Sequence, residues 1–183
     1  MSADQRGLRE AIARELDRIG DVATQLWDGD CDFTADSGHP GWTYGHVATH
    51  IARGSEILAD TVLSLSAETG DLRQAAIERS TEIDREATRP GAVIITDFEH
   101  ATRRFARIVD AVPAEEWSTT LLPTGGRSAS ISDIVGVWLA EMRLHVPALL
   151  LNGERSSRTP TDQCLLIDFL PTAAHPPRAV DVP

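Results

Sequence analysis

Four long segments of the chain repeat apolar residues at the spacing of an amphipathic helix. They cover about residues 4–27, 43–65, 91–111 and 130–150, and residues rich in Gly, Pro, Ser and Asp separate them. Apolar side chains at every third or fourth position share one face, and such faces are buried by packing against one another. No convincing strand pattern and no internal repeat is present. The sequence therefore predicts an all-α fold, a four-helix bundle.

Local signals refine this prediction. A weaker, charge-rich helix is expected over 71–88, between the second and third main helices, because Pro90 disfavours helix just before it. Ser130, followed three residues later by Asp133, resembles a capping box that starts the last helix. Pro147 has no N–H and should kink or end that helix. We expect a bundle over residues 1–155, with a Pro-rich tail over 156–183 that packs on it or extends from it.

The amino-acid composition of the chain argues against several classes of function. The net charge of −11 argues against binding to nucleic acid or an anionic membrane. All 17 basic residues are Arg, so Schiff-base lysines and lysine-containing phosphate loops are excluded. No apolar run reaches the roughly 18 residues of a membrane span, and no signal peptide is visible, so we expect a cytoplasmic protein. Cys31 and Cys164 stand far apart, which indicates free thiols and no thiolate zinc site.

Three ionisable residues occupy positions that should face the bundle core. His50 shares the apolar face of the second helix, and Glu141 and His145 lie one turn apart on the apolar face of the fourth. Burying an unpaired charge costs several kcal/mol of folding free energy, so these groups need partners. A divalent ion bound by all three residues would be such a partner. Two nitrogens and one carboxylate oxygen suit Zn²⁺ and also Fe²⁺, and three protein ligands leave a position open, as in catalytic sites.

Simpler interpretations stay open at this stage. Glu and His at this spacing occur by chance on many helices. A histidine on an apolar face is often a hydrogen-bonded core residue, and Glu141 with His145 could form a plain ion pair.

Four further residues are candidates for lining the site. His46 lies one turn before His50 and could be a fourth ligand or a proton shuttle, although its place near the helix start favours exposure. Arg53 could receive an anionic substrate, or be solvated. Trp42 and Trp138 could line a pocket or serve as packing anchors.

The motifs around these residues resemble a known family. GWTYGHVATHIARGSEIL (41–58) and WLAEMRLHVPALL (138–150) are similar to the two signature segments of the DinB/YfiT-like bundle superfamily, and residues 80–117 resemble its middle. The similarity is closest to the mycothiol-dependent maleylpyruvate isomerase branch and spans about residues 8–153. It implies that His50, Glu141 and His145 are the three zinc ligands and that the thiol mycothiol is a cosubstrate.

The resemblance implies an enzyme that uses a low-molecular-weight thiol to isomerise, or to form a conjugate with, a small electrophilic substrate. That family's isomerase carries a further C-terminal domain, for which residues 156–183 are too few, so we expect a substrate other than maleylpyruvate. Two alternatives remain: a non-catalytic metal-binding or partner-binding bundle, and a zinc hydrolase that uses metal-bound water. A homodimer is also compatible with the sequence.

Overall fold

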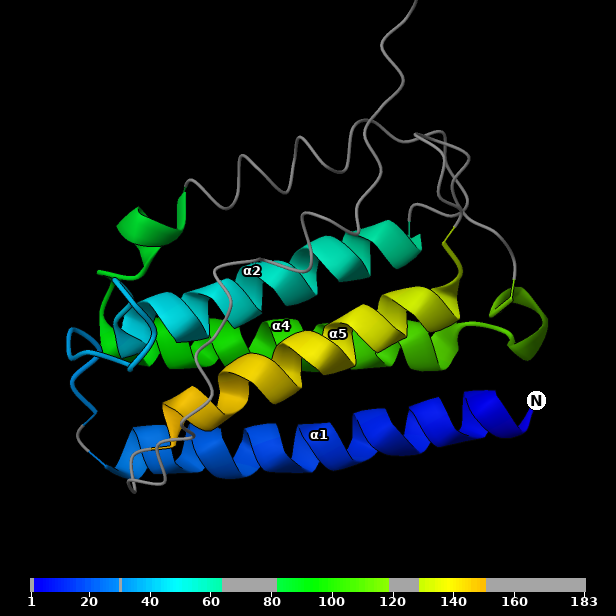
Figure 1. The fold of residues 1–183 in the computed structure, drawn as a ribbon, viewed down its shortest axis with the longest axis horizontal. Coiled ribbons are helices and arrows are strands. Elements are labelled where there is room, and N and C mark those ends of the chain that lie inside the picture. Colours follow the sequence, from blue (N-terminus) through cyan, green and yellow to red (C-terminus); the bar gives the residue numbers. More distant parts are fainter. Residues whose placement is uncertain (1, 30, 64–81, 119–128, 151–183) are drawn as a thin grey trace, which may run out of the picture.

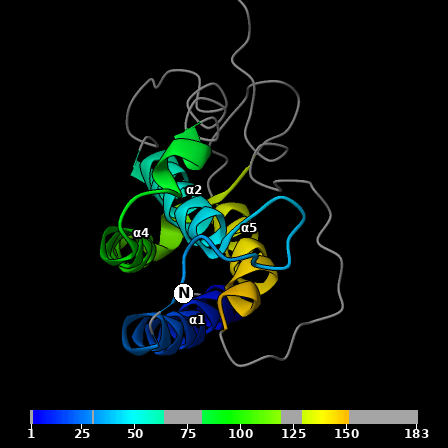
Figure 2. The same ribbon diagram turned by 90° about the vertical axis from the view of Figure 1, so that its left-hand side faces the viewer.

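The four predicted main helices form a bundle. The structure, a computed structural model, describes residues 2–29, 31–63, 82–118 and 129–150. Its helices are α1 (Ala3–Asp28), α2 (Tyr44–Leu63), α4 (Gly91–Ala111) and α5 (Ile131–His145), with short 3-10 helices η2 (Ala114–Glu116) and η3 (Val146–Leu149). Seen along the bundle in Figure 2, the four long helices surround one core. Figure 1 shows α5 crossing in front of α4, between α2 and α1. The all-α prediction is confirmed.

Capping and proline residues set the helix ends. Ser2 and Ser130 both form capping boxes, the latter with Asp133, so that prediction is confirmed. α5 ends as an α-helix at His145, and the chain tightens into η3, which contains Pro147. A proline cannot donate to the carbonyl four residues back, which explains the change of helix type. α4 begins directly after Pro90 and ends before Val112 and Pro113.

Large side chains from all four helices fill the core. Phe98 and Phe105 of α4 and Trp138 of α5 are fully buried, as is Trp117 after η2. The rings of Phe105 and Trp138 stack with centroids 4.9 Å apart, and the indole N–H of Trp138 donates to Ser55 Oγ on α2. Burial of each such side chain stabilises the fold by roughly 1.5–3 kcal/mol. The core is therefore mainly apolar, with a buried hydrogen bond that links α5 to α2.

Several predictions fall partly or wholly outside the described residues. Of the extra helix expected at 71–88, residues 82–88 are described: 82–86 are helical, and 87 and 88 form a turn that ends the helix two residues early. The tail over 156–183, Cys164 and the Asn152-Gly153 helix stop lie outside. Cys31 is described and is a free thiol. In the part of the chain that the structure describes, no helix is long and apolar enough to cross a membrane.

Candidate metal centre

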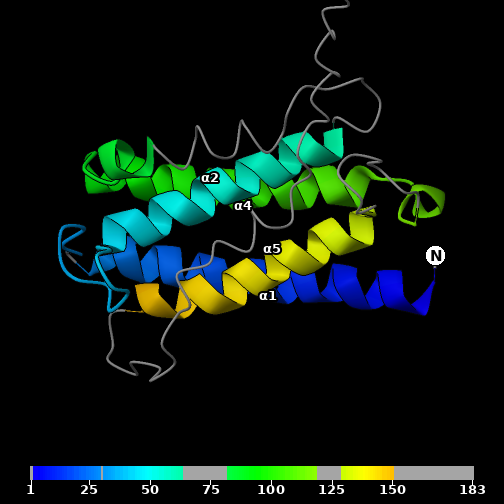
Figure 3. The same cartoon turned by 45° about the horizontal axis from the view of Figure 1, so that its top comes forward.

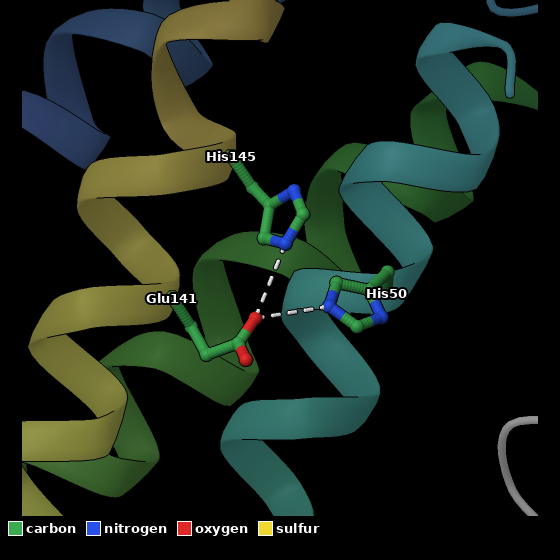
Figure 4. A group of neighbouring side chains, drawn as sticks. All are labelled: His50, Glu141 and His145. Atoms are coloured by element: carbon green, nitrogen blue, oxygen red, sulfur yellow. Dashed lines mark hydrogen bonds and ion pairs between the residues drawn. The ribbon is translucent and has the colours of Figure 1, made fainter. Parts of the chain in front are cut away.

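His50, Glu141 and His145 meet inside the bundle. Their side chains point toward one another from α2 and α5 (Figure 4). Glu141 Oε2 lies 3.2 Å from His50 Nε2 and 3.2 Å from His145 Nε2. One ligand atom from each residue lies within 4.8 Å of the other two. Figure 3 shows α2 and α5 side by side, which is how residues 91 positions apart in the sequence come together.

The spacing of these atoms fits a tetrahedral ion. Two ligand atoms that are each 2.0–2.1 Å from a zinc ion lie about 3.3–3.4 Å apart in a tetrahedron. The two observed separations of 3.2 Å are close to that value. The separation between the two histidine ligand atoms is bounded only by 4.8 Å, so these two side chains would close further on an ion that all three residues held.

Burial leaves two polar atoms of this group without partners. His50 and His145 are each 6% exposed and Glu141 is 3% exposed. Glu141 Oε1 and His145 Nδ1 are buried and make no hydrogen bond among the described residues. An unsatisfied buried polar atom costs about 1–3 kcal/mol. A plain core histidine or ion pair would satisfy more of these atoms, so the observation favours a site that takes up a further group.

The carboxyl group of Glu141 is held in its charged form. Burial alone would raise its pKa, but hydrogen bonds and charge interactions with His145 and His50 outweigh burial and lower the pKa to about 2. An ionised carboxylate is the form that binds metal, so Glu141 needs no deprotonation near neutral pH.

A turn before α2 brings two further rings to the same place. Trp42 is half-buried, and its ring centroid lies 5.0 Å from that of His50 and 6.0 Å from that of His145. His39 is 7% exposed, and its ring centroid lies 5.2 Å from that of His145. Burial, with His145 and His50 adding to it, lowers the pKa of His39. Trp42 thus lines the site, as considered from the sequence.

Sequence reasoning missed His39 because it lies in a loop, where helical periodicity carries no information. The available signal was the turn itself. The Trp42 N–H donates to the His39 carbonyl at 3.0 Å, and Gly41 between them has φ +75°. Pro at the second position and Gly at the third are the preferred residues of a type II turn. The sequence His39-Pro40-Gly41-Trp42 therefore predicts a tight turn that fixes both flanking side chains.

His46 lies apart from the three-residue cluster. Its Nδ1 lies 2.7 Å from Thr43 Oγ1 and accepts a hydrogen bond from the Thr43 N–H, and the side chain is half-buried and not exposed as the sequence favoured. Its Nε2 lies 3.5 Å from a carboxylate oxygen of the exposed Asp84. The structure therefore does not bring His46 into the group that could hold an ion.

Arg53 is committed to an ion-pair network. Its three guanidinium nitrogens each contact one carboxylate, those of Glu56, Glu86 and Asp97. Arg89 joins the network through Asp97. With all three nitrogens engaged, Arg53 ties α2 to α4 and to the segment before α4, and is not free to receive an anionic substrate. Trp138 is likewise a packing anchor in the core, as the alternative interpretation held.

A large cavity lies elsewhere in the described part of the chain. It has a volume of about 1050 Å³ and runs between α1 and α4, past Ile12, Glu99 and Arg103. None of the three cluster residues lines it. Its polar side chains are surface charges of both signs, whereas chemistry needs converging groups that water does not screen. The buried cluster between α2 and α5 is therefore the stronger functional site.

Comparisons with known proteins concern the fold and the family of the chain. No curated protein matches the chain significantly. Two solved structures match its fold: a histidine-to-alanine mutant of the mycothiol-dependent maleylpyruvate isomerase, with a TM-score of 0.68, and the mycothiol-dependent maleylpyruvate isomerase, with 0.62. Both are 17% identical over 81% of this chain, which spans 63% of their length.

The sequence profile of a defined family covers most of the bundle. It describes the mycothiol maleylpyruvate isomerase N-terminal domain and matches residues 10–146. That range contains the turn, α2, α4 and α5, and with them every residue of the buried cluster. The chain belongs to the mycothiol maleylpyruvate isomerase N-terminal domain family.

Proposed function

We propose that the protein is a metal-dependent enzyme, with zinc the preferred ion, that uses mycothiol to isomerise or to form a conjugate with a small electrophile. The observation that carries the proposal is the buried cluster of His50, Glu141 and His145, whose separations suit a tetrahedral ion. Family membership supports mycothiol as the thiol.

Each of the three residues would contribute differently to binding an ion. Glu141 supplies a negative charge that offsets part of the ion's charge in a buried place. Glu141 and His145 approach from one helix, and His50 approaches from another, so the packing of α2 on α5 sets their relative positions. Three ligands leave one tetrahedral position open. An ion bound here would act as a Lewis acid that lowers the pKa of a thiol.

The reaction class follows from thiol chemistry. For isomerisation, the thiolate sulfur adds to one carbon of an electron-poor double bond and leaves a stabilised carbanion on the neighbouring carbon; the resulting single bond rotates, and elimination restores the double bond and the thiolate. For transfer, the carbanion takes up a proton, equivalent to the one that the thiol lost on ionisation, and the conjugate is released with its carbon–sulfur bond intact. Trp42 and His39 cover the two histidines, so they exclude water from this side of the site.

Metal content tests the proposal directly. Purified, untagged protein is expected to carry about one divalent ion per chain, and His145→Ala should remove it while helical circular dichroism is kept. His46→Ala should keep the ion, because His46 bonds to Thr43 and lies outside the cluster. Wild-type protein that holds no ion and takes up neither zinc, nickel nor iron would exclude the metal site.

Thiol dependence separates the enzyme classes. Turnover of a panel of small electrophiles, maleylpyruvate included, should require mycothiol. Turnover without thiol would support a hydrolase instead, and binding of metal without any turnover would support a non-catalytic bundle.

A further inference from the structure

The side chain of His39 lies against other rings. The residue is 7% exposed, and its backbone N–H donates to Ser37 Oγ, while no hydrogen bond to its ring nitrogens is found among the described residues. These nitrogens are not among the fully buried atoms that lack a partner, so they are open to a ligand or to solvent. The neighbours of this ring are other rings, those of His145 at 5.2 Å and Trp42 at 6.1 Å between centroids.

The backbone, not the ring, fixes the position of His39. The type II turn joins His39 to Trp42, and the Trp42 carbonyl accepts from the Ser37 N–H at 3.1 Å and from Ser37 Oγ at 2.8 Å. An antiparallel bridge between Asp36 and Thr43 closes the base of the loop. The imidazole is therefore held against His145, and no described side chain bonds to its ring nitrogens.

His39 lies too far out to be a ligand in this arrangement. The atoms of His50, Glu141 and His145 are mutually within 4.8 Å, and His39 does not join that group. A ring that packs on one ligand histidine, but stands outside ligand distance, is placed to touch whatever occupies the open position. A cavity of about 340 Å³ is lined by His39, Trp42 and other residues of the loop before α2, so these two side chains border open space as well as the cluster.

We propose that His39 is a thiol-binding residue, whose ring N–H donates a hydrogen bond to the sulfur of the thiol at the open position of the site. An imidazole carries an N–H in either protonation state, so the contact does not depend on charge. The inference rests on the proposed thiol function, and it assigns recognition of the thiol to the turn and binding of the ion to the helices.

The test is a titration of cobalt-loaded, full-length protein with mycothiol, followed through the near-ultraviolet sulfur-to-cobalt charge-transfer band. His39→Phe keeps a ring but removes the N–H, and His39→Gln restores a donor. The control is His100→Phe, at an exposed histidine of α4. Metal content, and the cobalt spectrum before thiol is added, should match wild type in all three variants.

His39→Phe is expected to weaken mycothiol binding about tenfold, the loss of one hydrogen bond to a charged group. His39→Gln should recover part of that loss, and His100→Phe should bind as wild type does. If His39→Phe loses its helical circular dichroism, the smaller His39→Leu takes its place in the comparison.

Three results would overturn the inference, and they are distinguishable. Unchanged mycothiol affinity in His39→Phe would make His39 a packing residue and leave the proposed function intact. Loss of metal in His39→Phe would make His39 a ligand. A wild-type protein that binds cobalt but shows no thiol band would refute the thiol function itself, and the inference with it.

Discussion

At the scale of single residues, Glu141 is subject to two opposing effects on its pKa, burial and contact with two histidines. One carboxylate oxygen lies between two imidazole nitrogens, and the other is buried with no partner among the described residues. Contacts with His145 and His50 overcome the burial penalty and favour the ionised form. The charge of Glu141 therefore contributes to the stability of the metal-free protein as well as to metal binding.

This charge predicts a pH dependence for the metal-free protein. The folded-state pKa of about 2 lies below the ordinary value of 4.5, so the stabilisation is present above about pH 4.5 and is lost as pH falls toward 2. The shift corresponds to at most roughly 3 kcal/mol. Urea unfolding of wild type and Glu141→Gln should differ more at pH 6 than at about pH 3.

The surface variant Glu10→Gln on α1 serves as the control and should track wild type across this range. A difference between wild type and Glu141→Gln that stays constant with pH would show that the two histidines do not stabilise the carboxylate.

The residues of the candidate site were predictable to different degrees. His50, Glu141 and His145 follow from periodicity, because helix geometry converts sequence spacing into a shared inward face. His39 was not predictable in this way, since its approach depends on how a loop folds over helix ends. The partners of Arg53, up to 44 residues away, depend on which helices become neighbours.

At the scale of elements, the start of α2 is fixed by a close approach. Gly45 donates its N–H to the Phe33 carbonyl, and a Cβ at this position would overlap the carbonyl oxygen of Ala87. Glycine is required here for space, not for an unusual φ angle. This approach fixes the first turn of α2, one turn before His50, against the loop and the segment before α4.

Gly45→Ala should destabilise the protein by about 1–3 kcal/mol, because backbone must move to admit the methyl group. Gly136→Ala on α5 is the matched control: nothing lies within 4 Å of its added Cβ, so it should stabilise by about 0.5–1 kcal/mol through helix propensity. Chemical denaturation measures both. A neutral Gly45→Ala would mean that the contact with Ala87 relaxes easily.

The N-cap of α5 gives a second prediction at this scale. Ser130 and Asp133 bond reciprocally to each other's backbone N–H groups. Ser130→Ala should cost about 1 kcal/mol, which lowers Tm by about 2–4 °C in a chain of this size. Metal content should stay at the wild-type value, because Glu141 and His145 lie near the other end of the helix. Thermal unfolding with metal analysis checks both results.

The elements themselves were largely predictable. The predicted main helices at 4–27 and 91–111 match α1 and α4 to within one residue at each end. Capping and proline chemistry is local, which is why the start of α5 and its change to η3 could also be predicted. Which helices pack together could not be predicted from local sequence. In the folded chain α2 packs against α4 and also against α5, which is what brings His50 to Glu141 and His145.

At the scale of the whole molecule, the core and the site are separate sources of stability. The aromatic core of Phe98, Phe105 and Trp138 is fully buried and contains none of the three cluster residues. The site adds a link between α2 and α5 across 91 residues of sequence. Metal should therefore stabilise a bundle that already folds, unlike the small zinc domains that need metal to fold.

Chelator-treated protein should keep its helical circular dichroism and unfold cooperatively, with a lower Tm than the zinc-loaded form. Free zinc at about 100 times its dissociation constant should add about 2.7 kcal/mol, less any binding by Glu141 and His145 in the unfolded chain. His145→Ala should show no zinc-dependent rise in Tm. Loss of helical structure on chelation would contradict this separation.

The turn from His39 to Trp42 has a consequence for divergence within such a scaffold. Its shape depends largely on Pro40, Gly41 and a few hydrogen bonds inside residues 35–44, although Trp42 also packs against the bundle core. Exchange of the residues on this turn would alter one wall of the site while the helices and the ion-holding residues stay unchanged. Selection could therefore retune what the site accepts through a short stretch of loop, with little risk to the stability of the bundle that supports it.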